Sequence, residues 1–268
     1  MKDFLEGLYT QYHRKEFLGS DPLEIVHRYS GPVFDQADQE TVALIAALLA
    51  YGNVKQIRAS VESLLQRLDH SADRPSLALG ADRRVFRGWV HRFNRGDDLW
   101  LLLRLLARSW KEHGSLGAHL GQYMKPGVLD FSEALDQLIR EWKKWALELG
   151  PRSVAQSDSF GYLLTTPHAG STCKRWCMLM RWMVRKDELD LGLWSEWIRP
   201  DQLVMPLDTH TGRISQKMKF TKRKSLNWKA SLEVTRALKK YDAADPVKYD
   251  FAICRIGMFG VNLDTIRK

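Results

Sequence analysis

Residues 40–49 (ETVALIAALL) constrain the fold most, because they are apolar on nearly every side of a helix. Such a helix has no polar face for solvent and is expected at the centre of a helical core. Helical periodicity continues through most of the chain, and no strand-like alternation of apolar and polar residues persists. Further helices are expected over residues 53–68, 99–110, 131–149, 159–164, 173–185, 209–219, 228–240 and 245–258. Asn227 is the expected N-cap of the helix at 228–240, and Asp245 followed by Pro246 is expected to begin the last helix. The sequence therefore predicts an all-α fold with at least one deep core.

The charge balance favours a polyanionic partner. The 268 residues include 41 Lys and Arg against 32 Asp and Glu, which gives a net charge of +9. Nucleic acid is the first candidate partner, and a basic protein whose charge serves only solubility is an equal alternative. Net charge alone does not separate DNA from RNA. The ten Trp residues are expected to lie mostly in the core.

The cysteines exclude several kinds of site. Cys173, Cys177 and Cys254 are too few and too scattered for a disulfide framework or a four-cysteine iron–sulfur cluster. Cys173 and Cys177 lie one helical turn apart without a paired His nearby, so buried small side chains are expected rather than a metal site. No cofactor is expected. The first residues lack a signal-peptide pattern, and the longest apolar run, residues 42–50, is too short to cross a membrane, which predicts a cytoplasmic protein.

The segment 203–213 (LVMPLDTHTGR) delivers a carboxylate to the start of a helix. An apolar run ends at Pro206, and Asp208 is expected to cap a helix that begins at Thr209. A carboxylate there stays ionised, because the free N–H groups and the positive dipole end of the helix favour the negative charge. Asp208 is therefore a candidate to stabilise an oxocarbenium-like sugar or to accept a proton. The plain alternative is an ordinary N-cap, and His210 is expected to support such a site by hydrogen bonding.

A turn at residues 166–171 (TPHAGS) breaks two helical patterns and places Lys174 in the first turn of the second helix. An amine that attacks a sugar carbon must be neutral, and both the helix start and the neighbouring Arg175 favour a lowered pKa. Lys174 is therefore a candidate nucleophile. The alternatives are a solvated first-turn lysine and a lysine that pairs with a phosphate.

The segment 245–258 (DPVKYDFAICRIGM) offers an aromatic and acidic set, Tyr249, Asp250 and Phe251. Such side chains are able to stack on a base and to read its edge. The alternative is that Phe251 is a core residue and that Asp250 caps a helix or pairs with a cation.

Several segments carry a resemblance that covers most of the chain. They are residues 48–53 (LLAYGN), 170–175 (GSTCKR), 181–185 (RWMVR), 206–210 (PLDTH) and 245–252 (DPVKYDFA). In these segments the chain resembles the DUF2400 family. The Lys174 turn and the Leu-Asp-Thr-His segment at 207–210 also look like the helix-hairpin-helix DNA glycosylase superfamily. The long gap between Lys174 and Asp208 is most similar to that of its archaeal 8-oxoguanine branch.

This resemblance implies a fold of two interleaved helical lobes within a single unit, residues 1–268. Residues 30–150 would form one lobe, residues 1–29 and 151–268 the other, and a cleft and a helix-hairpin-helix element would bind DNA. Lys174 and Asp208 would be catalytic and would converge in space. The implied substrate-binding residues are Pro206, Tyr249, Asp250, Phe251, Asn53 and Gln56, the last two filling the gap left by an extruded base. The implied DNA-binding residues are His168, Gly170, Ser171, Thr172, Arg175, His210 and Arg213.

The expected function is base excision in DNA repair by a monomer associated with the nucleoid. The resemblance implies a bifunctional glycosylase and lyase that acts on duplex DNA with an oxidised purine such as 8-oxoguanine. Three alternatives stay open: a monofunctional alkylated-base glycosylase in which Lys174 only contacts phosphate, a non-catalytic nucleic-acid binder of the same fold, and an RNA-directed enzyme.

Overall fold

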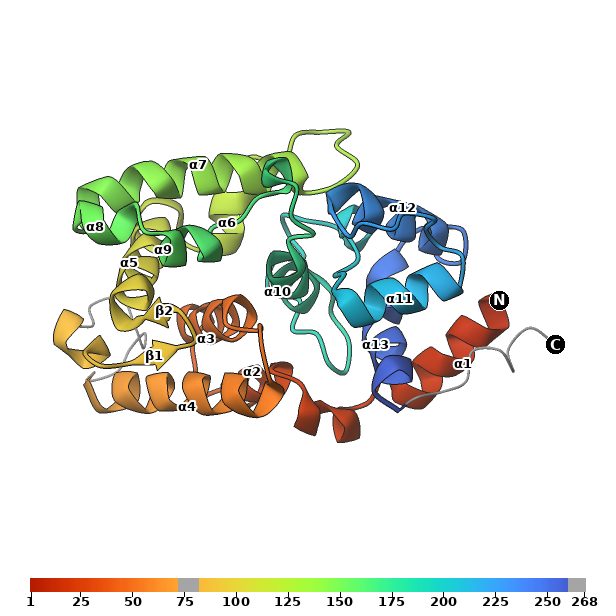
Figure 1. The fold of residues 1–268 in the computed structure, drawn as a ribbon, viewed down its shortest axis with the longest axis horizontal. Coiled ribbons are helices and arrows are strands. Elements are labelled where there is room, and N and C mark those ends of the chain that lie inside the picture. Colours follow the sequence, from red (N-terminus) through yellow and green to blue (C-terminus); the bar gives the residue numbers. More distant parts are fainter. Residues whose placement is uncertain (72–81, 260–268) are drawn as a thin grey trace. The chain divides into compact units, whose positions relative to one another are not determined.

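The computed structural model describes residues 1–71 and 82–259, and over these residues it is mostly helical (Figure 1). It contains thirteen α-helices within those ranges, together with short 3-10 helices and one two-stranded hairpin. The all-α prediction is therefore confirmed. Over the same ranges, none of the helices combines the length and the apolar character that a membrane crossing requires.

The chain forms two compact units, each assembled from separate stretches of sequence. Unit 1 comprises Met1–Phe17, Pro126–Ser132 and Thr166–Lys268, and unit 2 comprises Leu18–Lys125 and Glu133–Thr165. The 3-10 helix η1 (Lys15–Ser20) runs across the first boundary. Each unit has its own buried helix, α3 in unit 2 and α10 in unit 1.

Unit 2 is built around α3 (Gln36–Leu48), the helix predicted from the apolar run. Its residues 42–48 are fully buried, and α3 packs against α2 (Leu23–Arg28), α4 (Val54–Ser71) and α5 (Gly96–His113) (Figure 1). Asp35 caps the start of α3 by accepting a hydrogen bond from the backbone N–H of Asp38. The remaining helices of this unit are η2 (Arg83–Phe86), α6 (Leu116–Gly121), α7 (Ser132–Leu149), α8 (Arg152–Ala155) and α9 (Asp158–Leu163).

The charged residue Glu40 lies on the buried helix α3, and hydrogen bonds explain why it is tolerated there. Glu40 is fully buried, and its carboxylate accepts hydrogen bonds from the backbone N–H groups of Leu116 (2.9 Å) and Gly117 (3.3 Å). These groups are at the start of α6, where N–H groups have no partner within the helix. Glu40 therefore satisfies donors of a second helix while remaining in the core.

The hairpin of unit 2 was not predicted. Strands β1 (Val90–His91) and β2 (Asn94–Arg95) have two residues each, too few for a periodic signal. Buried side chains hold them in place: His91 Nδ1 lies 3.0 Å from Ser60 Oγ, and Asn94 Nδ2 donates to the carbonyl of Ser159 at 2.7 Å. The hairpin therefore depends on partners that are remote in sequence.

Unit 1 surrounds α10 (Lys174–Val184), whose residues 175–184 are all buried. A second apolar cluster joins α1 (Lys2–Tyr12), α11 (Thr209–Lys217), α12 (Trp228–Lys239) and the C-terminal helix α13 (Asp250–Phe259) through side chains that include Leu5, Ile214, Val234 and Ile253. Two 3-10 helices precede these elements, η3 (Pro167–Ala169) before α10 and η4 (Pro200–Gln202) before α11. Cys173 and Cys177 are buried, as the sequence predicted.

Of the capping predictions at two helix starts, one is confirmed and the other is wrong. Asn227 caps α12 as predicted, because its side chain accepts the backbone N–H of Ala230 at 3.1 Å. The prediction of a continuous α-helix from Pro246 is wrong. Residues 246–249 form the 3-10 helix η5 (Pro246–Tyr249), and α13 begins only at Asp250. The carboxylate of Asp245 does not cap the backbone, because it accepts hydrogen bonds from Arg185 instead.

Candidate functional site at the starts of α10 and α11

Asp208 is the N-cap of α11. Its Oδ1 accepts hydrogen bonds from the backbone N–H groups of His210 (2.8 Å) and Thr211 (2.9 Å), and its own N–H donates to Thr211 Oγ1 at 2.9 Å. The preceding residues Pro206 and Leu207 are buried, so the chain enters the helix along a fixed path. This reciprocal arrangement holds the carboxylate rigidly and leaves Oδ2 for another partner.

Lys174 is the first residue of α10 and supplies that partner. Gly170 (φ 77°) and Cys173 (φ 49°) both adopt left-handed backbone conformations that turn the chain into the helix. The conformation of Cys173 is uncommon for a residue with a side chain, and its N–H is held by Ser171 Oγ at 3.0 Å. Lys174 Nζ donates to Asp208 Oδ2 at 2.8 Å. The two residues therefore meet across 34 positions of sequence, which is the convergence expected from the resemblance.

The ion pair is only partly shielded from solvent. The side chain of Lys174 is 32% exposed and that of Asp208 is 29% exposed. Burial raises the pKa of the Asp208 carboxyl, but the charge and hydrogen bond of Lys174 and the bonds from Thr211 outweigh burial, and the pKa falls to about 2. Both side chains are thus charged and directly paired near neutral pH, at the point where two helix starts meet.

The pKa of Lys174 departs from the sequence expectation. Burial lowers the pKa of its ammonium, as expected, but the adjacent Asp208 carboxylate outweighs burial and places the pKa above its ordinary value. The expectation of a lowered pKa is therefore wrong for the free protein. It considered the helix start and Arg175, whereas the dominant charge comes from a distant segment.

The predicted DNA-binding residues lie on the loop before α10 and on the first turns of α10 and α11. His168, Gly170, His210 and Arg213 are exposed, and Ser171 and Thr172 are half-buried. Arg175 is buried, with 7% exposure. Thus four of these residues are accessible to a binding partner, while Arg175 is buried inside unit 1.

The structure buries the three residues predicted to contact a base. The hydroxyl of Tyr249 donates to Glu6 Oε1 at 2.5 Å, and Asp250 Oδ2 accepts from Arg181 Nη1 at 2.6 Å. Phe251 is 1% exposed and lies under the guanidinium of Arg255, which is 4.1 Å from the ring centroid. The alternative reading, a core aromatic and a paired carboxylate, describes these residues as observed.

Arg181 and Arg185 form an internal ion-pair network, in line with the structural role that their apolar helix suggests, although the sequence did not identify all of their partners. Arg181 bonds to both Asp190 and Asp250, and Arg185 pairs with Asp187, Asp190 and Asp245. Ligand atoms of His13, Asp187 and Asp190 lie within 4.8 Å of one another. The two guanidinium groups already supply the cationic charge at these carboxylates, so the cluster is explained as a link between α10 and the neighbouring segments of unit 1.

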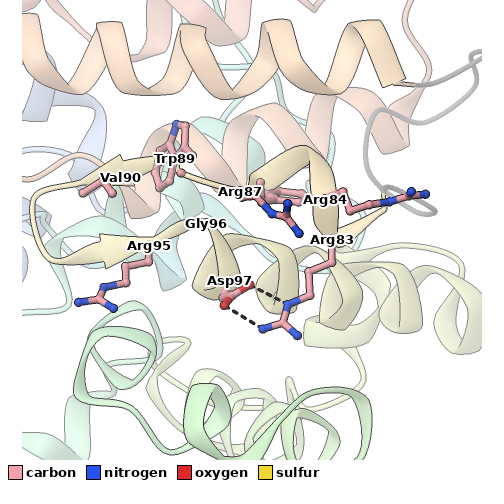
Figure 2. A pocket seen from close by; sticks show the side chains of 10 residues that line it. Arg83, Arg84, Arg87, Trp89, Val90, Arg95, Gly96 and Asp97 are labelled. Atoms are coloured by element: carbon pink, nitrogen blue, oxygen red, sulfur yellow. Dashed lines mark hydrogen bonds and ion pairs between the residues drawn. The ribbon is translucent and has the colours of Figure 1, made fainter.

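The remaining predicted residues belong to unit 2. Asn53 and Gln56 are exposed at the start of α4, where Asn53 Oδ1 accepts from the N–H of Lys55 at 2.9 Å. Their proposed role beside an extruded base stays a prediction. Sequence reasoning missed a nearby arginine-rich segment of the same unit, residues 83–95, which lines the cavity in Figure 2. A local count of charge would have found it, because five arginines occur in residues 83–95.

Comparisons with known proteins give one result. A family model described as "Protein of unknown function (DUF2400)" matches residues 21–259. No curated protein and no solved structure matches the chain. The matched segment contains Lys174, Asp208 and the segments that suggested the resemblance. The chain therefore belongs to the DUF2400 family.

Proposed function

We propose that this protein is a DNA repair glycosylase with lyase activity, related to the helix-hairpin-helix glycosylase superfamily. Its proposed substrate is duplex DNA with an oxidised purine such as 8-oxoguanine. The observation that carries the proposal is the contact between Lys174 Nζ and Asp208 Oδ2, 2.8 Å apart at the starts of two helices. An amine and a carboxylate held together are the groups that base excision through a covalent sugar intermediate requires.

In the proposed reaction, the substrate first separates Lys174 from Asp208, and the Lys174 ammonium then loses a proton from Nζ to water while Asp208 stays ionised. The neutral amine forms a bond to the sugar carbon C1′ while the bond from C1′ to the base breaks. The base leaves with that electron pair and takes up a proton. The bound amine then loses a proton, and its lone pair opens the sugar ring as the ring oxygen is protonated. The product is a protonated imine between Lys174 and the sugar.

The free protein represents the resting state of this reaction. The proton stays on Lys174, because Asp208 is a weak base with a pKa of about 2. A nucleotide that enters between the two side chains separates them and removes the carboxylate that raises the pKa of Lys174. Burial, the largest influence on the ammonium, then favours the neutral amine. Asp208 meanwhile faces the positive charge that develops on the sugar.

The surroundings of the pair support binding of a polyanion. Two helix starts meet there, α10 with eleven residues and α11 with nine, and the positive end of a helix dipole favours phosphate. His168 and Gly170 are exposed before α10, and His210 and Arg213 are exposed on α11. The net charge of +9 acts in the same direction.

A second candidate is favoured by one observation, the raised pKa of Lys174. A lysine that stays charged is suited to an electrostatic role. The corresponding function is a monofunctional glycosylase, in which Asp208 activates water and Lys174 orients the carboxylate or a phosphate. It differs from the first candidate in releasing base without forming an imine.

The test is to measure base release and borohydride trapping together on a panel of duplexes with oxidised or alkylated bases. We expect a covalent adduct with the protein, lost in Lys174→Gln and retained in the control Lys229→Gln, an exposed lysine of α12. We expect Asp208→Asn to slow base release by roughly 100-fold or more. Base release without an adduct identifies the monofunctional enzyme, and no base release from any duplex refutes both candidates.

A further inference from the structure

A cavity of about 410 Å³ in unit 2 is lined by an unusual number of arginines (Figure 2). It lies between η2, the hairpin and the start of α5. Its lining includes the guanidinium-bearing residues Arg83, Arg84, Arg87 and Arg95 and a single acidic residue, Asp97. The lining alone thus has four positive charges against one negative charge.

The charges of this cavity are only partly neutralised. Arg83 binds Asp97 through two hydrogen bonds of 2.7 and 2.8 Å, drawn in Figure 2, and Arg84 pairs with the adjacent Asp82. Among the side chains that the structure describes, no carboxylate lies within ion-pair distance of Arg87 or Arg95, and both are exposed. Within residues 1–71 and 82–259, two guanidinium groups at the cavity are therefore available to an incoming anion.

The backbone that carries these arginines is fixed. Arg67 of α4 donates to the carbonyls of Val85 (3.4 Å) and Arg87 (3.0 Å). Gly96 packs so closely that a Cβ there would lie 1.9 Å from the carbonyl oxygen of Phe86. In the hairpin register Val90 pairs with Arg95, and both are exposed at the cavity. The arginines thus project from a preformed frame, which lowers the entropic cost of binding.

We propose that this cavity binds a phosphate of the nucleic-acid backbone, with Arg87 and Arg95 as its principal ligands. Guanidinium groups donate in a planar fork that matches phosphate oxygens, and they stay charged at every physiological pH. This assignment rests on the proposed function for the identity of the polymer. It adds a contact in unit 2 that none of the residues of the Lys174–Asp208 site supplies.

The hairpin itself favours a nucleic acid over a small phosphate ester. Its turn presents Phe93, which is 48% exposed and stacks on Tyr51 with ring centroids 5.4 Å apart. The neighbouring Arg92 has a left-handed backbone (φ 55°) and is exposed. An exposed aromatic ring beside cations is the kind of surface on which an unpaired base stacks. A free phosphate would make no use of it.

The test is equilibrium binding of a fluorescent DNA duplex across a range of salt concentrations. We expect the double variant Arg87→Gln/Arg95→Gln to bind at least ~10-fold more weakly and to reduce the slope of log K against log salt by about 1, for the one phosphate contact that is lost. The matched control is Arg152→Gln, an exposed arginine of α8 that does not line the cavity. It should leave both quantities unchanged, and far-UV circular dichroism establishes that each variant is folded.

Competition with inorganic phosphate and with a nucleoside monophosphate separates the possible sources of the anion. Saturable binding of either small anion that depends on Arg87 and Arg95, with unchanged DNA affinity in the double variant, overturns the assignment to nucleic acid. An unchanged salt slope overturns it as well. Base release is assayed separately at saturating DNA. Weaker DNA binding by the double variant supports phosphate binding in the cavity even if no duplex releases a base. Loss of trapping in Lys174→Gln with an unchanged salt slope bears on the catalytic proposal alone.

Discussion

The ion pair between Lys174 and Asp208 is expected to stabilise the folded protein by an amount that follows from the pKa of Asp208. Replacing Asp208 by Asn removes the negative charge but keeps a residue that is an equally good helix N-cap. Replacing it by Ala removes both the charge and the cap. Comparing the two variants therefore separates the free energy of the ion pair from that of the cap.

The magnitude comes from the pKa of Asp208, which falls from 3.8 to about 2 on folding. Each pKa unit corresponds to about 1.4 kcal/mol, so the charged carboxylate contributes on the order of 2 kcal/mol to the free energy of unfolding at pH 7. Asp208→Asn should lose about that amount, and Asp208→Ala about 1 kcal/mol more for the cap. Because the Asp208 side chain is 29% exposed, solvent screens the ion pair, and the value of about 2 kcal/mol is an upper limit.

The stabilisation by the Asp208 carboxylate should decrease as the pH falls. The folded-state pKa lies below the unfolded one, so the stabilisation is complete above a pH of about 4 and is lost as the pH falls through about 2. At pH 3 about half of the difference between the wild type and Asp208→Asn should be gone. On the alkaline side the pKa of Lys174 is raised, so its contribution persists past the ordinary value of 10.5.

The assay is urea unfolding followed by circular dichroism at pH 7 and pH 3, with hydrogen exchange of peptides from residues 205–218 as a local readout. The Asn variant should show faster exchange in α11 than the wild type at pH 7. Equal stability of the wild type and Asp208→Asn at pH 7 would show that the ion pair contributes nothing, and a difference that is the same at both pH values would show that it does not arise from the Asp208 charge.

Two further predictions concern stability. Asp250→Asn should lower the free energy of unfolding by about 2 kcal/mol, because it removes one of the two carboxylates that pair with the buried Arg181 and leaves Asp190. Thermal unfolding measures this, and a loss no larger than that of Asp201→Asn, whose side chain is partly exposed, would contradict it. Gly96→Ala should destabilise unit 2 strongly, since its Cβ would overlap the carbonyl of Phe86, whereas Gly161→Ala, with open space around it, should not. Equal melting temperatures of the two alanine variants would disprove that steric account.

The sequence alone was sufficient wherever the cause is local. The apolar run 40–49 predicted a buried helix, because a helix without a polar face has no stable place in water. Asn227 and Asp208 predicted helix starts, because an N-cap acts on N–H groups two or three residues away. The charge of +9 and the scattered cysteines also required no coordinates.

Local sequence made Lys174 and Asp208 candidate residues and the resemblance implied that they converge, but the effect of each on the other depends on tertiary structure. The direction of the Lys174 pKa shift depends on a carboxylate 34 positions away, so local neighbours gave the wrong sign. The resemblance assigned Tyr249 and Phe251 to a base pocket, whereas the residues themselves already favoured a core position for Phe251. Only packing distinguishes the two environments.

The arginine cavity and the Arg181–Asp250 pair also separate what local sequence determines from what tertiary structure determines. Local sequence determines which residues are charged and where helices begin, because capping and periodicity act over about one helical turn. It does not determine which charges become partners, since Coulomb interactions depend on distance in space and on burial. Arg181 thus became part of a core and Arg95 part of an open cavity, although both are arginines in a basic chain.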